Sequence, residues 1–308
     1  MTDLPIPAED AGARPKAKAI SPLRAAMLDF KASPLAMAGL LVMIVMVLAA
    51  ALAPWITPQN PYDLSQLSIM DNNLRPGSES FSGMTYWLGT DPQGRDMLSA
   101  IIYGLRMSLI VAVTATLCAL AIGMAMGIIA AYFGGRVDTI IMRVVDLQLS
   151  FPAILVALIL LAVLGKGVDK VIIALVIVQW AYYARTVRGS ALVERQRDYI
   201  AAARGLGLGH ARVMFRHLLP NTLPPLIVVA TVQIAQAIAL EATLSFLGVG
   251  VPVTEPSLGL LIANGYSYLL SGAYWISVYP GVALLIAIVA INLVGDQLRD
   301  VLNPRLRR

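Results

Sequence analysis

The chain has 308 residues, of which 58% are hydrophobic and only 13% are charged, and its mean hydropathy is +0.75. A soluble domain has about 25% charged residues, so this composition indicates a protein whose main solvent is a lipid bilayer. The formal net charge is +5, and the single cysteine, Cys118, lies inside an apolar run. One cysteine excludes both an internal disulfide framework and a metal site built from several cysteines.

Six apolar segments approach the roughly 20 residues that a helix needs to cross the hydrocarbon core. They cover residues 35–56, 105–131, 141–164, 171–187, 222–247 and 274–294. The first segment begins well inside the chain, and its apolar run is too long for a cleaved signal peptide. We therefore predict an all-α membrane protein with six transmembrane helices, the first of which, at 34–56, is an uncleaved anchor.

The distribution of positive charge predicts the orientation of these helices. If the six segments are threaded in turn, all but five of the 23 lysines and arginines fall on one side of the membrane. Basic residues collect in cytoplasmic segments. We therefore predict a partly disordered cytoplasmic tail at 1–33, a cytoplasmic C-terminal tail at 299–308, and a cytoplasmic loop at 188–221 inside a core of 105–298. Residues 57–104 become a periplasmic loop, which is long enough to suggest a docking function.

A second, shorter external segment and a stripe of small residues complete this outline. Residues 248–273 carry tyrosines and a following tryptophan that suit the aromatic belt of a membrane interface. Small residues recur every fourth position in the second apolar segment, at Ala115, Ala119, Gly123, Gly127 and Ala131. Such stripes let helices approach closely in lipid. The stripe fits packing within the chain or a contact between subunits, and we favour the first.

The motifs of catalysis are absent from the sequence. The phosphate-loop pattern of glycines and lysine is missing, and "GLGLGH" has the wrong glycine spacing for a dinucleotide fingerprint and follows a helical pattern instead of a strand. His210 and His217 have neither cysteine nor paired carboxylates nearby, which argues against metal binding. We therefore predict no catalytic residue, no metal site and no cofactor held by the chain itself, and a role as a conduit or coupler.

Charged residues near the apolar segments need a reason, because each costs about 2.5–3.5 kcal/mol at a helix centre on insertion scales. Glu241 and Arg106 both fall near the predicted outer ends of their helices. They fit either an ion pair across an external gate or two interfacial side chains that reach for water. Arg143 and Asp146 are three residues apart, which predicts a local pair on one helix.

The stretch "AAARGLGLGHARVMFRHLLPN", residues 201–221, interrupts the apolar chain with arginines and glycines. Each glycine weakens a helix by about 1 kcal/mol relative to alanine, so two short helices separated by a turn at 205–209 are favoured over one rod. We expect Pro220, Pro224 and Pro225 to end the second short helix and begin the next span. The residues alone fit either docking on another protein or an interfacial helix held by lipid phosphates.

Several blocks of the sequence carry a resemblance. Ala201-Ala202-Ala203, Gly207, His217 and Leu219-Pro220 follow the spacing of the E-A-A-x3-G-x9-I-x-L-P loop of ABC importer permeases. The blocks "WLGTDPQGRDMLSAIIYGLRMSL", "YFGGRVDTIIMRVVDLQLSFP", "LSFLGVGVP" and "NLVGDQLRDVLNPR" look like the second permease subunit of the dipeptide, oligopeptide and nickel branch. The resemblance covers residues 30–305. Ala201 replaces the glutamate of the family and His217 replaces its isoleucine, so a role of the acid is not carried over.

The resemblance implies a type I ABC importer permease in a bacterial inner membrane. It implies a homologous permease partner, two ATPase subunits that bind ATP and magnesium, a periplasmic substrate-binding protein, and peptides or else nickel complexes or other small polar solutes as cargo. It also implies that the cytoplasmic loop docks on an ATPase through a coupling helix. The residues concerned are Ala201, Ala202, Ala203, Arg204, Gly205, Leu206, Gly207 and His210.

Three other functions remain open at this point. An ion-coupled secondary transporter needs carboxylates or broken helices at mid-membrane depth, and only Glu241 is a candidate. A membrane enzyme needs a polar catalytic cluster, which the sequence does not show. A scaffold that only binds lipid through its basic loop would not retain an ATPase subunit. Nucleic acid is not an expected partner.

Overall fold

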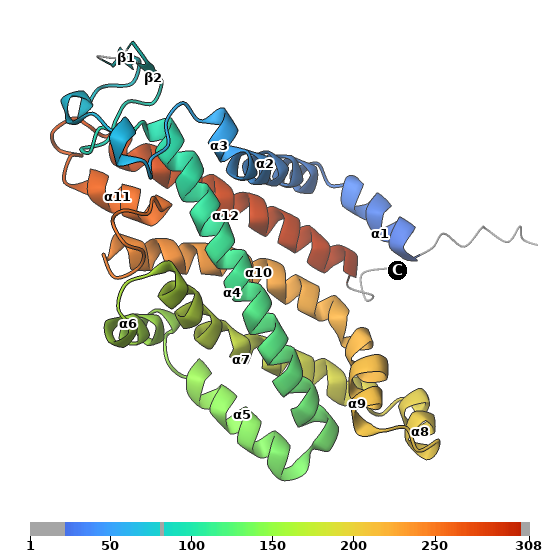
Figure 1. The fold of residues 1–308 in the computed structure, drawn as a ribbon. Coiled ribbons are helices and arrows are strands. Elements are labelled where there is room, and N and C mark those ends of the chain that lie inside the picture. The colour runs from blue at the N-terminus through green and yellow to red at the C-terminus, as the bar shows by residue number, and fades with distance from the viewer. Residues whose placement is uncertain (1–21, 81–82, 303–308) are drawn as a thin grey trace, which may run out of the picture.

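A computed structural model of the chain describes residues 22–80 and 83–302 as a bundle of long helices with a small polar cap at one end (Figure 1). Within these residues, five helices are long and apolar enough to cross a membrane, and a bent pair of shorter helices raises the number to six. The prediction of an all-α membrane protein is confirmed. Of the tails predicted at 1–33 and 299–308, residues 1–21 and 303–308 lie outside the described residues, whereas residues 22–31 and 299–302 are helical.

The element boundaries are as follows. The helices are α1 (Pro22–Lys31), α2 (Pro34–Ala51), α3 (Ala53–Ile56), α4 (Met97–Phe133), α5 (Gly135–Leu149), α6 (Ala153–Leu164), α7 (Val168–Glu194), α8 (Asp198–Gly205), α9 (His210–Arg212), α10 (Leu223–Phe246), α11 (Leu258–Tyr266) and α12 (Trp275–Leu302). Short 3-10 turns cover Leu64–Gln66, Ile69–Asp71 and Leu219–Thr222, and a π-helical segment covers Val213–Leu218. A two-stranded antiparallel hairpin joins β1 (Ser78–Glu79) to β2 (Thr85–Tyr86), with Ser78 opposite Tyr86.

The third predicted span is not one straight helix. The chain bends by 91° between α5 and α6, at the break around Pro152. Proline removes a backbone donor and disfavours helical geometry in the residue before it, so the helix ends before Pro152 and a new one begins after it. The sequence prediction of a single segment over 141–164 is wrong in this respect.

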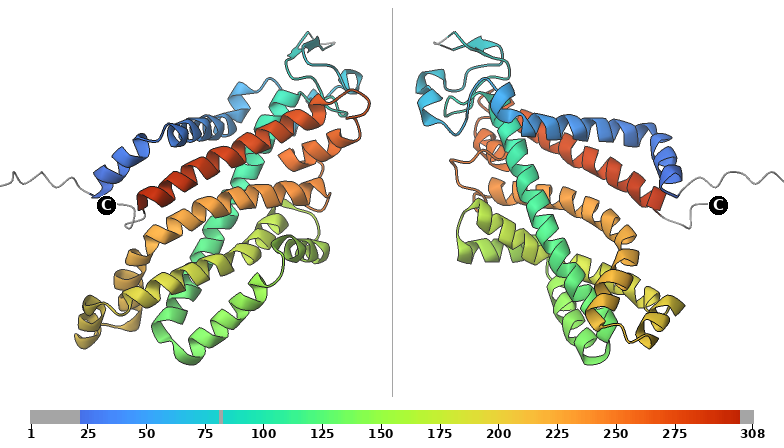
Figure 2. Two further views of the ribbon diagram at one scale, coloured as in Figure 1. Left: turned by 180° about the vertical axis from the view of Figure 1, so that it is seen from behind. Right: turned by 45° about the vertical axis from the view of Figure 1, so that its right-hand side comes forward.

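The longest helix, α4, packs most extensively against α7, and the stripe of small residues explains how (Figure 2). A methyl group added at Gly123 would lie 2.5 Å from the Tyr183 Cβ, and one added at Gly127 would lie 2.5 Å from the Ala184 carbonyl oxygen. Only glycine permits this approach of the two backbones, and close van der Waals contact is the main source of helix association in lipid. The stripe therefore serves packing within the chain, as favoured from the sequence.

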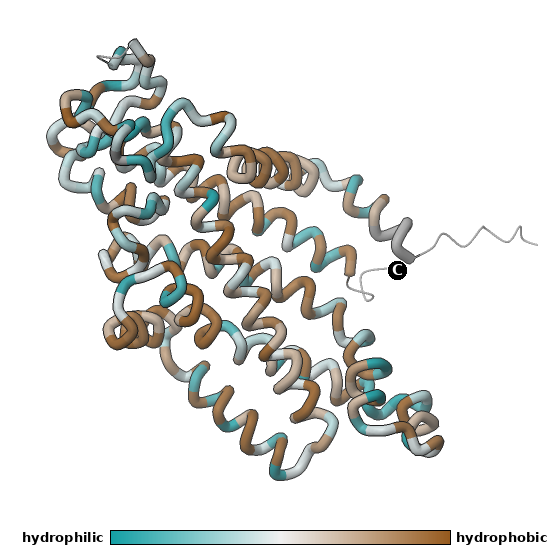
Figure 3. Tube along the Cα trace, viewed as in Figure 1, coloured by the Kyte–Doolittle hydropathy of each residue, from teal (hydrophilic) through white to brown (hydrophobic). Residues whose placement is uncertain are grey.

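Polar residues gather at two opposite ends of the bundle (Figure 3). One end carries the cap, residues 57–96, with α11 beside it; α8 lies at the other end (Figures 1 and 2). Two boundaries differ from the sequence prediction: α4 begins about two turns earlier than expected, at Met97, and α11 forms within the segment expected to be a loop. The side chain of Asp96 caps α4 by accepting a hydrogen bond from the Ser99 N–H.

Candidate functional site

The short helix α8 ends in a turn that requires glycine. The Leu208 N–H donates to the Ala203 carbonyl at 3.2 Å and the Gly207 N–H donates to the Arg204 carbonyl at 3.0 Å. These two bonds define a Schellman motif, whose residue after the C-cap adopts left-handed geometry. Gly207 has a φ of +72°, which a residue with a side chain adopts only with strain. The helix therefore stops at Gly207, as the glycine pattern predicted.

One face of α8 is anchored in the bundle. Ile200 is fully buried and Ala203 is nearly so, and both pack in a hydrophobic cluster with Val187, Val213 and Leu218. Burial of an isoleucine side chain contributes about 1.5–3 kcal/mol. Hydrophobic contact therefore fixes which face of α8 points outward.

A cluster at the end of α4, which we call the Tyr132 cluster (Tyr132, Arg204 and His210), joins α4 to both sides of the Gly207 turn. The Tyr132 hydroxyl and the His210 Nδ1 form a hydrogen bond of 2.8 Å. The Arg204 guanidinium lies 4.7 Å from the centre of the same ring, a cation–π contact. Arg195 adds a bond of 2.8 Å from its Nη1 to the Ala131 carbonyl. Direct contacts therefore join α8 and the segment after it to the end of α4.

A second set of bonds holds the start of α8. The Tyr199 hydroxyl donates to the Glu194 carboxylate at 2.9 Å and accepts from the Asn221 side-chain amide at 3.0 Å. Asn221 also donates to the His217 carbonyl. The pKa of Tyr199 is raised, first by partial burial and then by its bond to Glu194. The bonds connect α7, α8 and the 3-10 turn that precedes α10.

The outward face of α8 is small and open. Ala201, Ala202 and Gly205 are exposed, and Leu206 next to them is 79% exposed. A methyl group added at Gly205 or Gly207 would contact nothing within 4 Å. Of the predicted loop residues, Ala203 faces inward, Arg204 and His210 contact Tyr132, and the others form this open face, which we call the α8 face (Ala201, Ala202, Gly205, Leu206 and Gly207).

The prolines after α8 do not end the second short helix. From His210 to Phe246 the chain is one helical rod of 37 residues, in which the π-helical segment Val213–Leu218 and the 3-10 turn Leu219–Thr222 replace regular α-geometry. These local changes of winding accommodate Pro220, Pro224 and Pro225, which cannot donate the usual backbone bonds. The chain therefore stays helical where an end was expected, whereas Pro224 and Pro225 do lie in the first turn of α10, as expected for the start of the next span.

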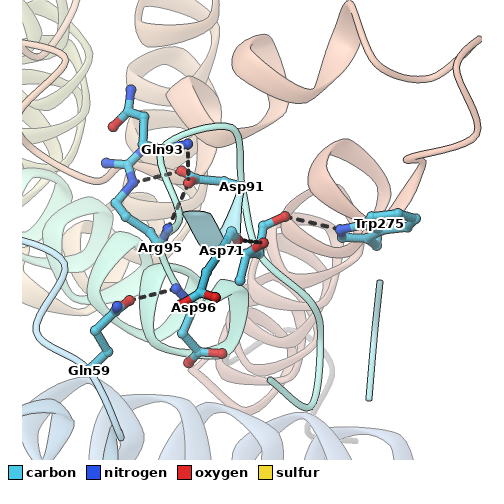
Figure 4. Close-up of polar contacts among 8 residues, drawn as sticks. Gln59, Asp71, Asp91, Gln93, Arg95, Asp96 and Trp275 are labelled. Atoms are coloured by element: carbon cyan, nitrogen blue, oxygen red, sulfur yellow. Dashed lines mark hydrogen bonds and ion pairs between the residues drawn. The ribbon is translucent and has the colours of Figure 1, made fainter. Parts of the chain in front are cut away.

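The cap at the opposite end is built around a buried ion pair (Figure 4). The Arg95 Nε lies 2.7 Å from an Asp91 carboxylate oxygen, and both side chains are at most 2% exposed. The other carboxylate oxygen accepts from the Gln93 and Arg95 backbone N–H groups at 2.8 and 2.9 Å. The pair therefore closes the turn 91–95 on itself.

Hydrogen bonds join the cap to two membrane helices, at Asp96, which caps α4, and at Trp275, which begins α12. The Gln59 side chain accepts from the Asp96 N–H at 2.6 Å, and the Trp275 Nε1 donates to the Thr90 carbonyl at 3.1 Å (Figure 4). Gly94 has a φ of +73°, and a methyl group there would lie 2.1 Å from the Ser68 carbonyl oxygen. The block "WLGTDPQGRDMLS" therefore specifies a tightly closed cap seated on α4 and α12.

Glu241 and Arg106 form no ion pair with each other among the residues that the structure describes. Glu241 is fully buried, and its carboxylate accepts hydrogen bonds from Ser108 of α4 at 2.7 Å and Ser245 of α10 at 2.8 Å. Arg106 is half-buried near Tyr62, whose pKa is raised to about 12 by burial and by Glu255 against the opposing effect of Arg106. The role of the two residues as a gate stays a prediction.

Three other sets of contacts differ from the sequence expectation or were missed. Asp146 pairs with Arg185 of α7 at 2.5 Å, instead of forming the local pair expected with Arg143. Tyr132 was not singled out, because an aromatic residue at the end of an apolar run carries no signal of its partners. The Asp91–Arg95 pair had a signal, the i, i+4 spacing of opposite charges.

The comparisons with known proteins agree with this architecture. Residues 123–308 match the family described as binding-protein-dependent transport system inner membrane component, and residues 21–76 match the N-terminal transmembrane domain of oligopeptide transport permease C. A putative peptide transport system permease protein of Brucella suis is 44% identical, with 87% of each chain covered. The di/tripeptide transport system permease protein DppC of Pseudomonas aeruginosa is 38% identical, with 93% of each chain covered.

A solved structure supports the fold. The MetNI methionine ABC transporter, in inward-facing conformations, contains a chain that superposes with a TM-score of 0.54 at 23% identity, over 67% of this chain and 97% of that one. The fold is therefore that of a type I ABC importer permease.

The membrane-crossing helices and the family match define the class of protein: a multi-pass permease of the bacterial inner membrane. The chain belongs to the family of binding-protein-dependent transport system inner membrane components, and it is the permease subunit of an importer of that kind.

Proposed function

We propose that the chain is one of two homologous permease subunits of a peptide importer. Two ATPase subunits, which bind ATP and magnesium, and a periplasmic substrate-binding protein complete the complex, and hydrolysis takes place on the ATPase subunits. The names of the relatives from Brucella suis and Pseudomonas aeruginosa support peptides as the cargo. Ligand capture tests this assignment: mass spectrometry of the co-purified binding protein should identify peptides, and a nickel complex as the bound ligand would contradict it.

The observation that carries the proposal is the α8 face. It is small, open and set on a helix whose opposite face is locked into the bundle. A flat surface of alanines and glycines lets another protein approach the backbone closely. The end of the bundle that carries α8 is accordingly cytoplasmic, in line with the arginines around it, and by the same rule so are the segments that precede α2 and follow α12.

Docking at α8 provides a route from ATP to the membrane helices. Closure of the two ATPase subunits would displace α8, and the Tyr132 cluster would pass the displacement to α4 while the rod from His210 passes it to α10. Coupling of this kind requires that ATP and the binding protein favour different conformations of the permease pair.

Substitution of Gly207 tests the docking. Gly207→Arg places a charged side chain on the α8 face, and it should abolish both the capture of ATPase subunits and transport while the chain stays in the membrane. Gly77→Arg is a matched control, because Gly77 also has a positive φ, +82°, and open space around it, but lies on the cap. Normal ATPase capture by Gly207→Arg, or equal loss in both variants, would count against the assignment.

The cap is the proposed contact for the binding protein. Three large apolar side chains, Ile69, Met70 and Trp87, are 81%, 74% and 71% exposed on it. Exposed apolar groups rimmed by polar residues mark protein contacts, and the rigid cap presents them in a fixed arrangement.

Ile69→Glu tests this contact. In the reconstituted complex it should weaken the stimulation of ATPase activity by the binding protein and leave the basal ATPase rate unchanged. Gln93→Glu adds the same charge at another exposed position of the cap and should have little effect. Full stimulation in Ile69→Glu, or deletion of the hairpin tip without loss of stimulation, would exclude the cap as the docking site.

A further inference from the structure

Two cavities form one continuous groove along α10. The first, of about 830 Å³, lies between α7, α10 and the end of α12, and the second, of about 400 Å³, continues along α7 and α10 toward α6. Three residues line both cavities: Tyr182, Gln233 and Gln236. On α10 the groove follows a single helix face from Pro224 to Thr243, which is nearly the full length of the helix.

Two amides stand at the middle of this groove. Gln233 and Gln236 lie close to the midpoint of α10, Leu223–Phe246, and therefore close to mid-membrane depth. The Gln233 side chain is nearly buried, the Gln236 side chain is exposed, and neither makes a side-chain hydrogen bond to a residue that the structure describes. Gln179 of α7 differs, because its amide is satisfied by Thr116 and by the Gln233 carbonyl.

An unpaired amide facing hydrocarbon is costly, since lipid offers no hydrogen bond in exchange for water. Gln236 is therefore better suited to water or to a polar solute than to lipid tails. The middle of the groove also lacks charge: among its lining residues, the charged ones are Asp296 and Arg299, which lie near the end of α12 on the α8 side. A neutral row of hydrogen-bonding groups suits the backbone amides of a peptide and is indifferent to the charge of its side chains.

We infer that this groove is the part of the translocation path contributed by this chain, and that Gln236, with Gln233 and Tyr182, hydrogen-bonds the backbone of a passing peptide without selecting its charge. The inference rests on the proposed peptide import and adds the residues and the chemistry of recognition. Both amides can donate and accept, which matches the alternating N–H and C=O groups of a peptide.

Opposite charges placed at Gln236 test the inference. The complex, with its partner permease, ATPase subunits and binding protein, is reconstituted in proteoliposomes, and ATP-dependent uptake of alanine tripeptides with a central lysine or a central glutamate is compared. Gln236→Glu should raise the ratio of lysine-peptide to glutamate-peptide uptake by about fivefold, and Gln236→Lys should lower it to a similar extent, through one charge interaction across a wet groove. Gln236→Leu, which removes the amide without adding charge, should reduce uptake of both peptides.

The controls separate the possible failures. Gln93→Glu, on the cap, should leave the ratio unchanged. If the ratio of lysine-peptide to glutamate-peptide uptake in both charged variants matches that of the wild type, the inference is overturned. It is also overturned if the Gln236 variants lose the partner permease during purification, because the groove would then be a subunit contact. Uptake of neither tripeptide by the wild-type complex would contradict the proposed function itself, and the assignment of the groove with it; uptake by the wild type with unchanged ratios would contradict the assignment alone.

Discussion

The cap and the α8 face, at opposite ends of one bundle, are built on opposite principles. The cap is closed by a buried ion pair, a glycine that touches a neighbouring backbone, and a tryptophan bonded across to it from α12. The α8 face is open, and its glycines have empty space around them. Changes to the bonds that close the cap should therefore act on stability, whereas changes to the exposed Leu206 side chain of the α8 face should act mainly on function.

The largest effect on stability is expected for Asp91→Ala. It leaves the Arg95 charge buried without its partner, and breaking a buried pair in this way costs about 3–5 kcal/mol. Thermal unfolding of the purified subunit in detergent measures the change. Asp63→Ala is the control, because among the described residues the Asp63 carboxylate bonds to Ser65 and Gln66, both in its own turn. Similar unfolding of the two variants would mean that the ion pair does not hold the cap.

Trp275→Phe comes next. The substitution removes the five-membered ring that carries Nε1, so the buried Thr90 carbonyl loses its donor, which costs about 1–3 kcal/mol. The unfolding assay applies again, with Trp55→Phe as a control, because Trp55 is 78% exposed. If the two tryptophan variants unfold alike, the bond between cap and α12 contributes nothing measurable.

Gly207→Ala and Gly205→Ala form a pair of smaller, local effects. At φ +72° the alanine costs about 1–2 kcal/mol, whereas in the helical position of Gly205 alanine should stabilise α8 by up to about 1 kcal/mol. Hydrogen exchange of the α8 amides should therefore quicken in the first variant and slow in the second. Shifts in the same direction would show that backbone geometry does not control this turn.

The smallest effect on stability is expected for Leu206→Glu. A side chain that is 79% exposed contributes little, so the free energy of unfolding should change by less than about 0.5 kcal/mol. Capture of ATPase subunits should nevertheless weaken by about tenfold or more, which corresponds to about 1.4 kcal/mol. Leu270→Glu, exposed on the cap side of the bundle, should leave capture unchanged. An unaffected affinity in Leu206→Glu would contradict docking at the α8 face.

Much of the fold was predictable because the length of each apolar run can be read from the order of residues along the chain. The helix stop at Gly207 was also predictable, since glycine is the residue that accepts its left-handed geometry at little cost. The bend at Pro152 was missed because apolar residues continue on both sides of it. Pro220, Pro224 and Pro225 misled in the other direction, because the chain stays helical through the π-helical segment and the 3-10 turn that precede α10.

The candidate sites divide in the same way. The position of α8 between two apolar helices followed from the sequence, but its partners did not. Tyr132, Arg204 and His210 meet only because α4 and the rod from His210 cross at that end of the bundle. For Glu241 the sequence suggested an ion pair with Arg106, whereas packing gives its carboxylate two serine partners.

The sequence by itself determined a bundle of membrane-crossing helices, a glycine-terminated short helix and a close contact along α4, because hydropathy, backbone freedom and side-chain size are properties of single residues. Only the tertiary structure decided which charges are paired and which face of α8 is open. It also decided that Gln233 and Gln236 line the same groove. These outcomes depend on the relative placement of helices far apart in the chain, which local patterns do not encode.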